Sequence, residues 1–392
     1  MRTIRDLEIT GKRVLIRVDF NVPMDESGNI TDDLRITSVL DTIEYAVSKK
    51  ARVILCSHMG RPKGKRVERF SLAPVARHLG ELLGKKVSFA PDCIGAEVEA
   101  MVATMQDGDV LLLENLRFHA EEQENDPAFA KQLARIADVY INNAFAVSHR
   151  AHASVVGVTR YVAEKAAGFL LEKELEYFHR SVDEPVRPLV AIVGGAKVSS
   201  KLGALTNMLD KVDAMLIGGA MANTFLKSQG HGVGASKVEN DLMQEASKFL
   251  TTASQKGVKV YLPVDVVAAD SFAADAVSKQ VTIQDIPDGW MALDIGPATV
   301  ICFQEVLRDA RTIIWNGPMG AFEMDPFAQG TRGVARAVAS AHALSITGGG
   351  DSNAAVKKFG EAPNISYMST GGGAFLMLME GKELPGVVAL EG

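Results

Sequence analysis

The hydrophobic positions along the chain follow two alternating patterns. Nine short apolar runs, most of them rich in β-branched residues, are typical of buried strands. They span residues 13–18, 52–57, 110–113, 139–142, 189–193, 214–218, 259–264, 312–316 and 344–347. Amphipathic stretches of helical length separate them at 36–49, 72–83, 96–105, 202–211 and 241–249, and a longer helix is predicted over 164–182. Strands that are apolar throughout need cover on both faces, so this alternation predicts an α/β fold with parallel sheets.

Chain length and a shift in composition divide this pattern into two parts. The chain has 392 residues, which is enough for two domains. Most arginines and histidines precede residue 185, whereas 25 of the 35 glycines follow it. The stretch DEPVRP at 183–188 is suited to a joint between domains. We therefore expect two doubly wound parallel-sheet, Rossmann-like domains, joined by the long helix at 164–182 and this hinge.

Composition and charge exclude several classes of protein. Lys and Arg total 42 against 48 Asp and Glu, and the net charge of -6 argues against a nucleic-acid partner. The three cysteines lie far apart and form neither a disulfide framework nor a CxxC metal site. The first residues lack the apolar core of a signal peptide, and no apolar run reaches the length of a membrane span. We expect a cytoplasmic protein with no membrane or nucleic-acid partner.

The residues that follow each predicted strand are the candidates for ligand binding, because open parallel sheets bind ligands beyond the carboxyl ends of their strands. In the first half these segments carry arginine, histidine and short polar residues, which suit a small ligand with two or three negative charges. They are VDFN at 18–21, SHMGR at 57–61, ENLRF at 114–118, NNAF at 142–145 and SHRAHAS at 148–154. In the second half the corresponding segments are glycine-rich, which suits a polyphosphate on backbone N–H groups. They are GGAK at 194–197, GGAMA at 218–222, NGPMG at 316–320 and GGGDS at 348–352.

Several common catalytic and nucleotide-binding signatures are missing from the sequence. The stretch GGAKVSSK at 194–201 lacks the spacing of a P-loop, and no GxGxxG follows the first strand. Asp19-Phe20-Asn21 is not accompanied by the HRD of protein kinases, and neither HExxH nor GxSxG occurs. A nicotinamide dehydrogenase, a P-loop enzyme and a protein kinase therefore have little support from the sequence.

The ordered motifs resemble those of the phosphoglycerate kinase family along the whole chain. The matching stretches are RVDFNVP at 17–23, DDLRI at 32–36, SHMGRPKG at 57–64, ENLRF at 114–118, HRAHAS at 149–154, GGAKVSSK at 194–201, NMLDKVD at 207–213, DIGPAT at 294–299, WNGPMGAFE at 315–323, TGGGDS at 347–352 and STGGGA at 369–374. Departures from the family pattern occur at Asn143, Ala146, Ala220, Ser352 and Phe375, and none of them removes a charged substrate ligand.

The resemblance implies a division of labour between the domains. Residues 1–185 would hold 3-phosphoglycerate, residues 186–370 would hold the Mg²⁺-nucleotide, and residues 371–392 would pack back on the first domain. The implied activity is the glycolytic and gluconeogenic transfer of a phosphoryl group between ATP and the carboxylate of 3-phosphoglycerate, giving 1,3-bisphosphoglycerate and ADP. Mg²⁺ would accompany the nucleotide, the domains would close during catalysis, and the chain would act as a monomer.

The resemblance also assigns roles to individual residues. Those implied for the acid substrate are Asp19, Asn21, Arg35, His58, Arg61, Arg117 and Arg150. Those implied for the nucleotide are Gly195, Lys197, Lys201, Gly219, Asn316, Pro318, Glu323, Gly349, Gly350, Asp351 and Ser352, with Asp351 holding the Mg²⁺. Those implied for the transfer step are Arg35, Lys197, Lys201, Gly372 and Gly373. No general base is expected, because the accepting carboxylate is already ionised at pH 7.

Some alternatives stay open at the level of sequence. His152 is either a substrate ligand or a support of its loop, and Asp351 is either the metal ligand or a helix N-cap. Lys197 and Lys201 are four residues apart and are expected on one face of a helical turn. The alternative enzyme is an ATP-dependent kinase of another small carboxylate, and the alternative outside enzymes is a nucleotide or polyanion sensor.

Overall fold

The structure is a computed structural model that describes residues 1–392, and the chain folds into two compact units. Unit 1 comprises Met1–Leu175 and Glu383–Gly392, and unit 2 comprises Glu176–Lys382. The first boundary falls inside helix α7 (Phe169–Phe178), earlier in the chain than the joint expected at 183–188. The expected fold class, two α/β units with parallel sheets, is confirmed.

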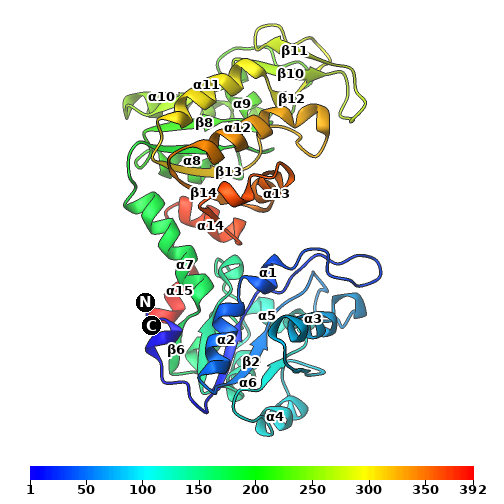
Figure 1. The fold of residues 1–392 in the computed structure, drawn as a ribbon. Helices are drawn as coiled ribbons and strands as arrows, with labels where there is room; N and C mark the ends of the chain where they lie inside the picture. The colour runs from blue at the N-terminus through cyan, green and yellow to red at the C-terminus, as the bar shows by residue number, and fades with distance from the viewer. The chain divides into compact units, whose positions relative to one another are not determined.

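Unit 1 is built on a six-stranded parallel sheet in the order β3-β4-β2-β1-β5-β6. Figure 1 labels β2 and β6 of this sheet. Its strands are β1 (Arg13–Arg17), β2 (Arg52–Cys56), β3 (Val87–Phe89), β4 (Val110–Leu112), β5 (Val139–Asn142) and β6 (Glu164–Ala167). Its helices besides α7 are α1 (Leu34–Thr37), α2 (Leu40–Ser48), α3 (Ala73–Leu83), α4 (Ala96–Ala103), α5 (Glu121–Glu124), α6 (Pro127–Arg135) and α15 (Pro385–Glu391). The carboxyl ends of β1, β2, β4 and β5 therefore lie side by side at one edge of the sheet.

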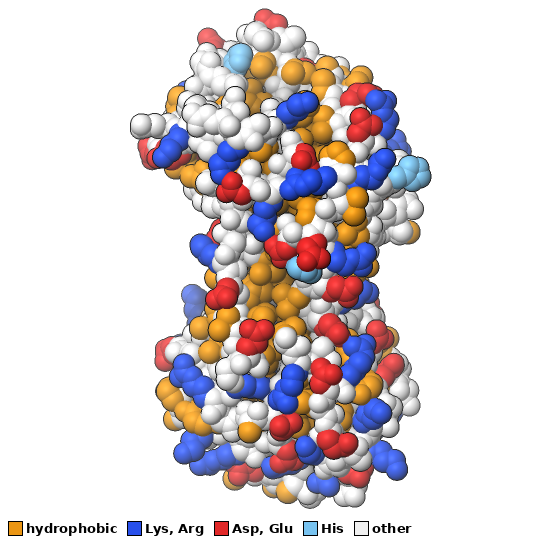
Figure 2. All heavy atoms as spheres, turned by 90° about the vertical axis from the view of Figure 1, so that its left-hand side faces the viewer, with side chains coloured by type: hydrophobic (Ala, Val, Ile, Leu, Met, Phe, Trp, Pro, Cys, Tyr) orange, Lys and Arg blue, Asp and Glu red, His pale blue; other side chains and the backbone are white.

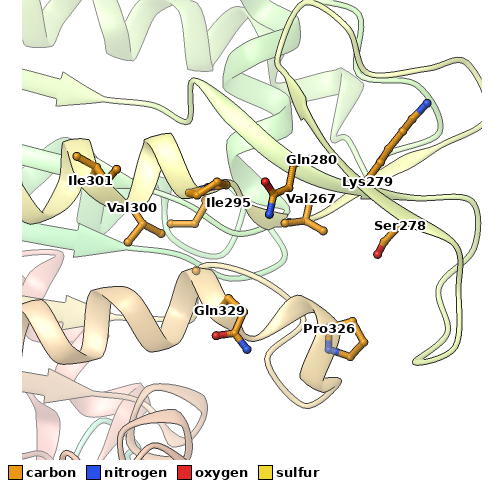
Figure 3. A pocket seen from close by; sticks show the side chains of 11 residues that line it. Val267, Ser278, Lys279, Gln280, Ile295, Val300, Ile301, Pro326 and Gln329 are labelled. Atoms are coloured by element: carbon orange, nitrogen blue, oxygen red, sulfur yellow. The ribbon is translucent and has the colours of Figure 1, made fainter.

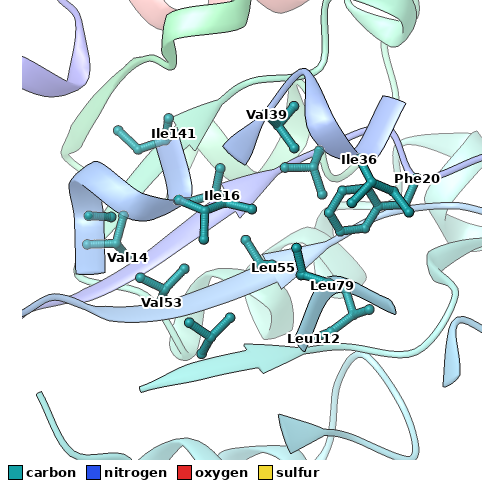
Figure 4. Packing of buried hydrophobic residues seen from close by; sticks show 14 of the residues in the cluster. Val14, Ile16, Phe20, Ile36, Val39, Val53, Leu55, Leu79, Leu112 and Ile141 are labelled. Carbon is teal, nitrogen blue, oxygen red and sulfur yellow. The ribbon is translucent and has the colours of Figure 1, made fainter. Parts of the chain in front are cut away.

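The core of unit 1 fixes where these strand ends lie. Alternate residues of β1 and β2, among them Ile16 and Leu55, are fully buried in one apolar cluster with Ile36 and Val39 from the α1–α2 region (Figure 4). Phe20, just beyond β1, is buried in the same cluster. Because burying one such side chain contributes about 1.5–3 kcal/mol, the cluster holds the segment that follows β1 in one register.

Unit 2 repeats the architecture with a second six-stranded parallel sheet, in the order β15-β14-β13-β7-β8-β9. Its strands are β7 (Leu189–Val193), β8 (Ala214–Ile217), β9 (Lys259–Tyr261), β13 (Thr312–Asn316), β14 (Leu344–Gly348) and β15 (Tyr367–Met368). Its helices are α8 (Leu202–Met208), α9 (Met221–Ser228), α10 (Met243–Gln255), α11 (Pro297–Arg308), α12 (Gln329–Ser340), α13 (Gly350–Lys358) and α14 (Gly372–Met379). The glycine-rich segments follow β7, β8, β13 and β14, as the sequence predicts.

A small antiparallel sheet, which sequence analysis did not predict, is added to unit 2. Strands β10 (Asp265–Ala269), β11 (Ser278–Thr282) and β12 (Met291–Ile295) form it in the order β11-β10-β12. The residues of β11 are almost all exposed, so this strand lacks the apolar run by which the other strands were found. The sheet matters for function because residues of β12 line a cavity described below.

Two predicted helices are wrong in part. Residues 164–182 begin with the edge strand β6, which pairs with β5, and only then form α7, followed by a π-helical turn (His179–Asp183). Gly168 separates strand from helix, and a Cβ atom there would lie 2.4 Å from the side chain of Asn143, so the turn is closely packed. The stretch predicted at 36–49 divides into the short helix α1 and the separate helix α2.

The C-terminal segment is shared between the units, which corrects the expected boundary at 371. Helix α14 packs against α8 in unit 2, and the chain rejoins unit 1 only from Glu383 onward. There the backbone N–H of Gly386 donates to the carbonyl of Ser148 at 2.8 Å, and Asn142 Nδ2 donates to the carbonyl of Gly386 at 3.2 Å. The segment that packs on unit 1 is therefore 383–392.

The surface and the helices add two observations. On the face drawn in Figure 2, acidic and basic side chains are interspersed, with hydrophobic areas between them. That face has no extended basic area of the kind that follows a nucleic-acid backbone. None of the helices combines the length and the apolar character that crossing a membrane would require.

Candidate functional site

Unit 1 buries a guanidinium at the carboxyl end of its central strand. Arg17 is the last residue of β1 and is fully buried. Its Nε donates to Ser154 Oγ at 2.8 Å, its Nη1 donates to the Val18 carbonyl, and its Nη2 lies 3.3 Å from His58 Nδ1. Sequence analysis gave Arg17 no role of its own. A charged residue at the end of an apolar strand was the signal that could have found it.

Asp19 orients the basic residues that follow. Its Oδ2 accepts a hydrogen bond from Arg35 Nη1 at 2.7 Å, and its Oδ1 lies 3.6 Å from His58 Nδ1. Burial, reinforced by the charges of Arg17 and Arg117, holds the pKa of His58 well below its usual range. His58 is therefore neutral at pH 7, where it offers one hydrogen-bond donor and one acceptor but no positive charge.

Arg117 is the group in this cluster that most clearly lacks a partner. Asn115 Oδ1 accepts from the backbone N–H of Arg117 at 3.0 Å, and Arg117 Nη1 donates to the Gly60 carbonyl at 2.8 Å. Its Nε and Nη2 are buried and have no hydrogen-bond partner. Burial, with the nearby charges of Arg150 and Arg17, lowers the pKa of Arg117 to about 10, so it stays charged at pH 7. Buried donors are normally satisfied, so this arrangement suits an anionic ligand that would accept from them.

The remaining predicted substrate residues differ in exposure. Asn21 Oδ1 accepts from the backbone N–H of Gly60 at 2.8 Å and so ties the segment after β1 to the segment after β2. Arg150 is half-buried, and its charge acts on both His58 and Arg117. Arg61 follows Gly60 directly and is exposed. The structure thus brings Asp19, Arg35, His58, Arg117 and Arg150 into one cluster, with Arg61 next to it in the chain.

A buried carboxylate supports the cluster from behind. Glu122 Oε1 and Oε2 accept from the hydroxyl and the backbone N–H of Ser154, at 2.6 and 2.9 Å. Burial raises the pKa of Glu122, and the charge of Arg17 opposes that rise. His152 Nδ1 lies 3.8 Å from Glu122 Oε1, and burial lowers the pKa of His152 to about 3. His152 Nδ1 is buried without a hydrogen-bond partner, so both roles considered for His152 stay open.

In unit 2, the segment after β7 packs against the segment after β13 through glycines. Lys201 Nζ donates to the carbonyls of Gly194 and Asn316, at 2.5 and 3.0 Å. Gly317 has φ +96°, and a Cβ atom there would lie 2.2 Å from the Gly194 oxygen, so only glycine fits this position. Burial lowers the pKa of Lys201 to about 8, and the charge of Asp351 opposes that shift. Lys201 therefore remains largely charged at pH 7.

Lys197 and Lys201 do not share a helical face, so this expectation is wrong. Residues 194–201 form turns, and α8 begins only at Leu202. Lys197 is exposed, whereas the ammonium group of Lys201 lies among backbone carbonyls. Both lysines therefore precede the helix that the spacing alone suggested, with Lys201 at its N-cap.

The segment after β14 begins helix α13. Gly349 is the N-cap of this helix, with φ +101°, so the N-cap interpretation of Asp351 is wrong. Asp351 lies in the first helical turn and is exposed. Ser352 is buried, and its hydroxyl accepts from the backbone N–H of Gly317 at 2.6 Å and donates to the Gly348 carbonyl at 3.0 Å. Its hydroxyl holds the two segments together.

These segments surround a cavity of about 450 Å³, a size typical of small-ligand sites. Five of the predicted nucleotide residues line it, namely Gly195, Gly219, Pro318, Glu323 and Asp351. Apolar side chains, including Phe272, Met291 and Leu293, form another part of its lining. The cavity therefore combines an apolar surface that suits a flat ring with the carboxylates of Glu323 and Asp351, whereas the N–H groups of Gly195 and Gly219 already donate to the carbonyls of Pro318 and Met319. The exposed Asp351 carboxylate is an oxygen ligand of the kind that Mg²⁺ prefers, so the residues present fit this ion.

A second cavity in unit 2, of about 650 Å³, has a different character (Figure 3). Val267, Ile295 and Val300 supply much of its lining, and none of the predicted nucleotide residues takes part. Its cation, Lys279, points away from the other labelled side chains and has its Nζ 4.5 Å from the centre of the Trp290 ring. This cavity therefore differs from the first in containing none of the predicted nucleotide residues.

Asp294 is a further residue for which sequence analysis gave no role. Its buried carboxylate accepts from the backbone N–H groups of Gly330 and Ile295, at 2.7 and 2.9 Å. A Cβ atom at Gly320 would lie 2.3 Å from Asp294 Oδ1, so the cavity-lining loop packs directly on this group. Burial raises the pKa of Asp294 to about 8. Asp294 belongs to β12 of the antiparallel sheet, which the sequence did not predict, so its buried position could not be expected from the sequence.

Comparisons with known proteins agree on one family. The family model described as Phosphoglycerate kinase matches residues 4–382. A protein named phosphoglycerate kinase from Desulfotalea psychrophila is 69% identical over 391 residues, covering 100% of both chains, and one from Desulforapulum autotrophicum is 58% identical over the same span and coverage. The solved structure of phosphoglycerate kinase from Coxiella burnetii is similar with a TM-score of 0.90 and 44% identity, covering 99% of this chain and 98% of that one.

Proposed function

Since the chain belongs to the phosphoglycerate kinase family, we propose that the cluster in unit 1 binds 3-phosphoglycerate and that the 450 Å³ cavity in unit 2 binds the Mg²⁺-nucleotide. The chain is a glycolytic kinase whose phosphoryl acceptor is a carboxyl group. What remains to be assigned is which residues perform this transfer and how.

The unpartnered donors of Arg117 carry the proposal for unit 1. Arg117 Nε and Nη2 are buried without acceptors, and the positive charges of Arg17 and Arg150 act on the Arg117 guanidinium. A phosphate or carboxylate bound there would accept from these donors and neutralise the concentrated charge. Arg35, held by Asp19, would bind the end of the substrate at which the phosphoryl group arrives.

In unit 2, the phosphates would lie on the backbone of the glycine segments beside Lys201. Asp351 would hold the Mg²⁺, which supplies charge neutralisation at the phosphate oxygens when it is bound. Glu323 would contact the ribose, and the first N–H groups of α14, at Gly372 and Gly373, would stabilise the transferring phosphoryl group. A Cβ atom at Gly372 would lie 2.8 Å from the Cα of Gly349, so this helix begins against the nucleotide segments.

The proposed transfer needs no general base. The accepting carboxylate is ionised at pH 7, and the lowered pKa of His58 makes that residue a poor proton acceptor. The protein instead aligns two polyanions, and the cations Arg35 and Lys201 offset the charge that develops. Both ligands must come within about 3–3.5 Å for transfer. Since their binding residues belong to different units, the units must close on one another.

A coupled assay for 1,3-bisphosphoglycerate formation from ATP and 3-phosphoglycerate tests the activity, with other small carboxylates as competing substrates. Activity on another carboxylate alone would favour the alternative kinase. Arg117→Ala should raise KM for 3-phosphoglycerate, whereas Arg77→Ala on the exposed surface of α3 is the matched control and should not. Small-angle scattering tests closure, because both ligands together should compact the molecule. An unchanged radius at saturation would contradict it.

We also propose that the protein acts in the cytoplasm as a monomer. Support comes from the glycolytic role of the family and from the fact that one chain carries both predicted ligand sets. Light scattering at working concentrations measures the mass directly, and a dimer mass would contradict the proposal.

A further inference from the structure

Unit 1 contains a cluster of three different metal-binding side chains, and none of them is among the residues implied for the substrate. Asp92 and Cys93 follow β3, and His119 follows the short 3-10 helix Leu116–Phe118. One ligand atom from each of the three, the carboxylate oxygen, the thiol sulfur and an imidazole nitrogen, lies within 4.8 Å of the other two. Neither the proposed transfer reaction nor the binding of 3-phosphoglycerate uses any of them.

The backbone holds these ligands in place. The N–H of Glu114 donates to the Asp92 carbonyl at 3.4 Å, and the N–H of His119 donates to the Leu116 carbonyl at 3.2 Å. The His119 ring packs on Phe129, with 5.3 Å between ring centres. Cys93 is completely buried, whereas the side chains of Asp92 and His119 are 44% and 26% exposed. The cluster is thus buried on its sulfur side and open to solvent on the other.

The present contacts converge on a single oxygen atom. Asp92 Oδ1 lies 2.7 Å from His119 Nε2 and accepts from the backbone N–H of Cys93, also at 2.7 Å. In a tetrahedral zinc site, with ligand distances of about 2.0–2.3 Å, adjacent ligand atoms are ~3.3–3.6 Å apart. The observed separations, from 2.7 Å to at most 4.8 Å, bracket this value. Side-chain rotations that move the ligand atoms by about 1 Å therefore suffice to form such a site.

The chemistry of the ligands selects the type of cation. Thiolate and imidazole favour zinc and similar soft or borderline ions, whereas Mg²⁺ and Ca²⁺ prefer oxygen ligands only. We propose that Asp92, Cys93 and His119 bind a thiophilic divalent cation of the zinc type, with solvent in the fourth position. The thiol proton leaves to solvent as the cation binds. One carboxylate and one thiolate then balance the double positive charge, which favours a half-buried site.

The site would also connect two parts of the substrate-binding unit. His119 lies two residues beyond Arg117, and Asp92 belongs to the segment after β3. A cation bound to both segments would cross-link them and stabilise unit 1, because a ligand that binds only the folded state raises stability.

Cadmium is the probe, because its bond to a thiolate gives a charge-transfer absorption in the ultraviolet. The full-length protein is titrated with Cd²⁺ in the presence of excess Mg²⁺, which occupies oxygen-only sites. We expect an absorption band that saturates at one equivalent of Cd²⁺ and that added Zn²⁺ suppresses by competition. The melting temperature of the protein should increase over the same range of Cd²⁺ concentration. Cys93→Ala should abolish the band, and His119→Gln and Asp92→Asn should each weaken Cd²⁺ binding at least ~10-fold.

Two controls separate this site from adventitious binding. Cys302→Ala removes the exposed cysteine, and His78→Gln removes another histidine that pairs with a carboxylate, His78 Nε2 being 3.0 Å from Asp33 Oδ2. Both variants should bind Cd²⁺ as the parent does. A band that survives Cys93→Ala or disappears in Cys302→Ala overturns the proposal, as does the absence of any band. If Cys93→Ala does not fold, His119→Gln and Asp92→Asn decide, and unchanged affinity in either refutes the site.

Discussion

Replacing Arg117 with methionine should make the free enzyme more stable and at the same time impair its binding of 3-phosphoglycerate. Arg117 is 4% exposed, and two of its donors have no partner. Burying an unsatisfied donor costs about 1–3 kcal/mol. Burial, together with the charges of Arg150 and Arg17, also lowers the pKa of Arg117 to about 10, so the cationic form is disfavoured at this position.

The net gain is smaller, because the substitution also removes a favourable contact. The hydrogen bond from Arg117 Nη1 to the Gly60 carbonyl is lost, at a cost of about 1 kcal/mol. We therefore expect Arg117→Met to raise the unfolding free energy of unit 1 by about 1–2 kcal/mol. For a unit of this size, that corresponds to a melting temperature higher by ~2–8 °C.

In the presence of saturating 3-phosphoglycerate, the parent enzyme should become more stable than Arg117→Met. A ligand at 100 times its dissociation constant stabilises the parent enzyme by about 2.7 kcal/mol. A variant that binds ~100-fold more weakly gains about 0.4 kcal/mol at the same concentration. Differential scanning calorimetry with and without 3-phosphoglycerate measures both differences, and steady-state kinetics gives the accompanying rise in KM.

Arg17→Met is the matched control, because Arg17 is equally buried but has partners. Its loss would remove the positive charge that most offsets the burial of Glu122, so we expect destabilisation of about 3–5 kcal/mol. If Arg117→Met lowers the melting temperature as Arg17→Met does, or leaves KM unchanged, the reasoning from the unpartnered donors is refuted.

Three further predictions concern the other groups of the two sites. His58→Gln should raise KM for 3-phosphoglycerate and largely spare kcat, because a neutral His58 only donates or accepts a hydrogen bond; loss of kcat at saturating substrate, with the fold intact by circular dichroism, would mean that His58 moves a proton. Lys201→Ala should lower kcat at least ~10²-fold, since Lys201 is the ammonium group held at the glycine segments, and a smaller loss than in Lys197→Ala would contradict its role in transfer. The stability of unit 2 should fall as the pH rises from about 5 to 8 and level off above, because burial raises the pKa of Asp294 to about 8 and its ionisation is therefore costly in the folded state. Urea unfolding followed by the fluorescence of Trp290 and Trp315, the two tryptophans of the chain and both in unit 2, measures this dependence, and a profile that Asp294→Asn does not flatten would exclude Asp294 as its source.

The strands were predictable wherever they are buried on both faces. β5, β7 and β13 have the predicted bounds, since each is buried along its whole length, has an apolar centre and is followed by a short polar or glycine segment. Strands without such a run were missed. β11 is exposed, and β6 was taken for the start of a helix because its sequence, EKAA, has helical preference and becomes a strand only by pairing with β5.

Family and reaction class were accessible from the sequence because they depend on ordered motifs at the ends of strands, which the topology of a parallel sheet necessarily gathers at one edge. The protonation and the hydrogen-bond partners of the side chains at that edge depend on the tertiary structure alone. Burial makes His58 neutral, leaves two donors of Arg117 unpartnered and raises the pKa of Asp294. The chain turns before α8 begins at Leu202, which leaves Lys197 exposed and places the ammonium group of Lys201 among backbone carbonyls. Burial, desolvation and pairing depend on side chains that are distant in the sequence, so no local pattern of residues carries that information.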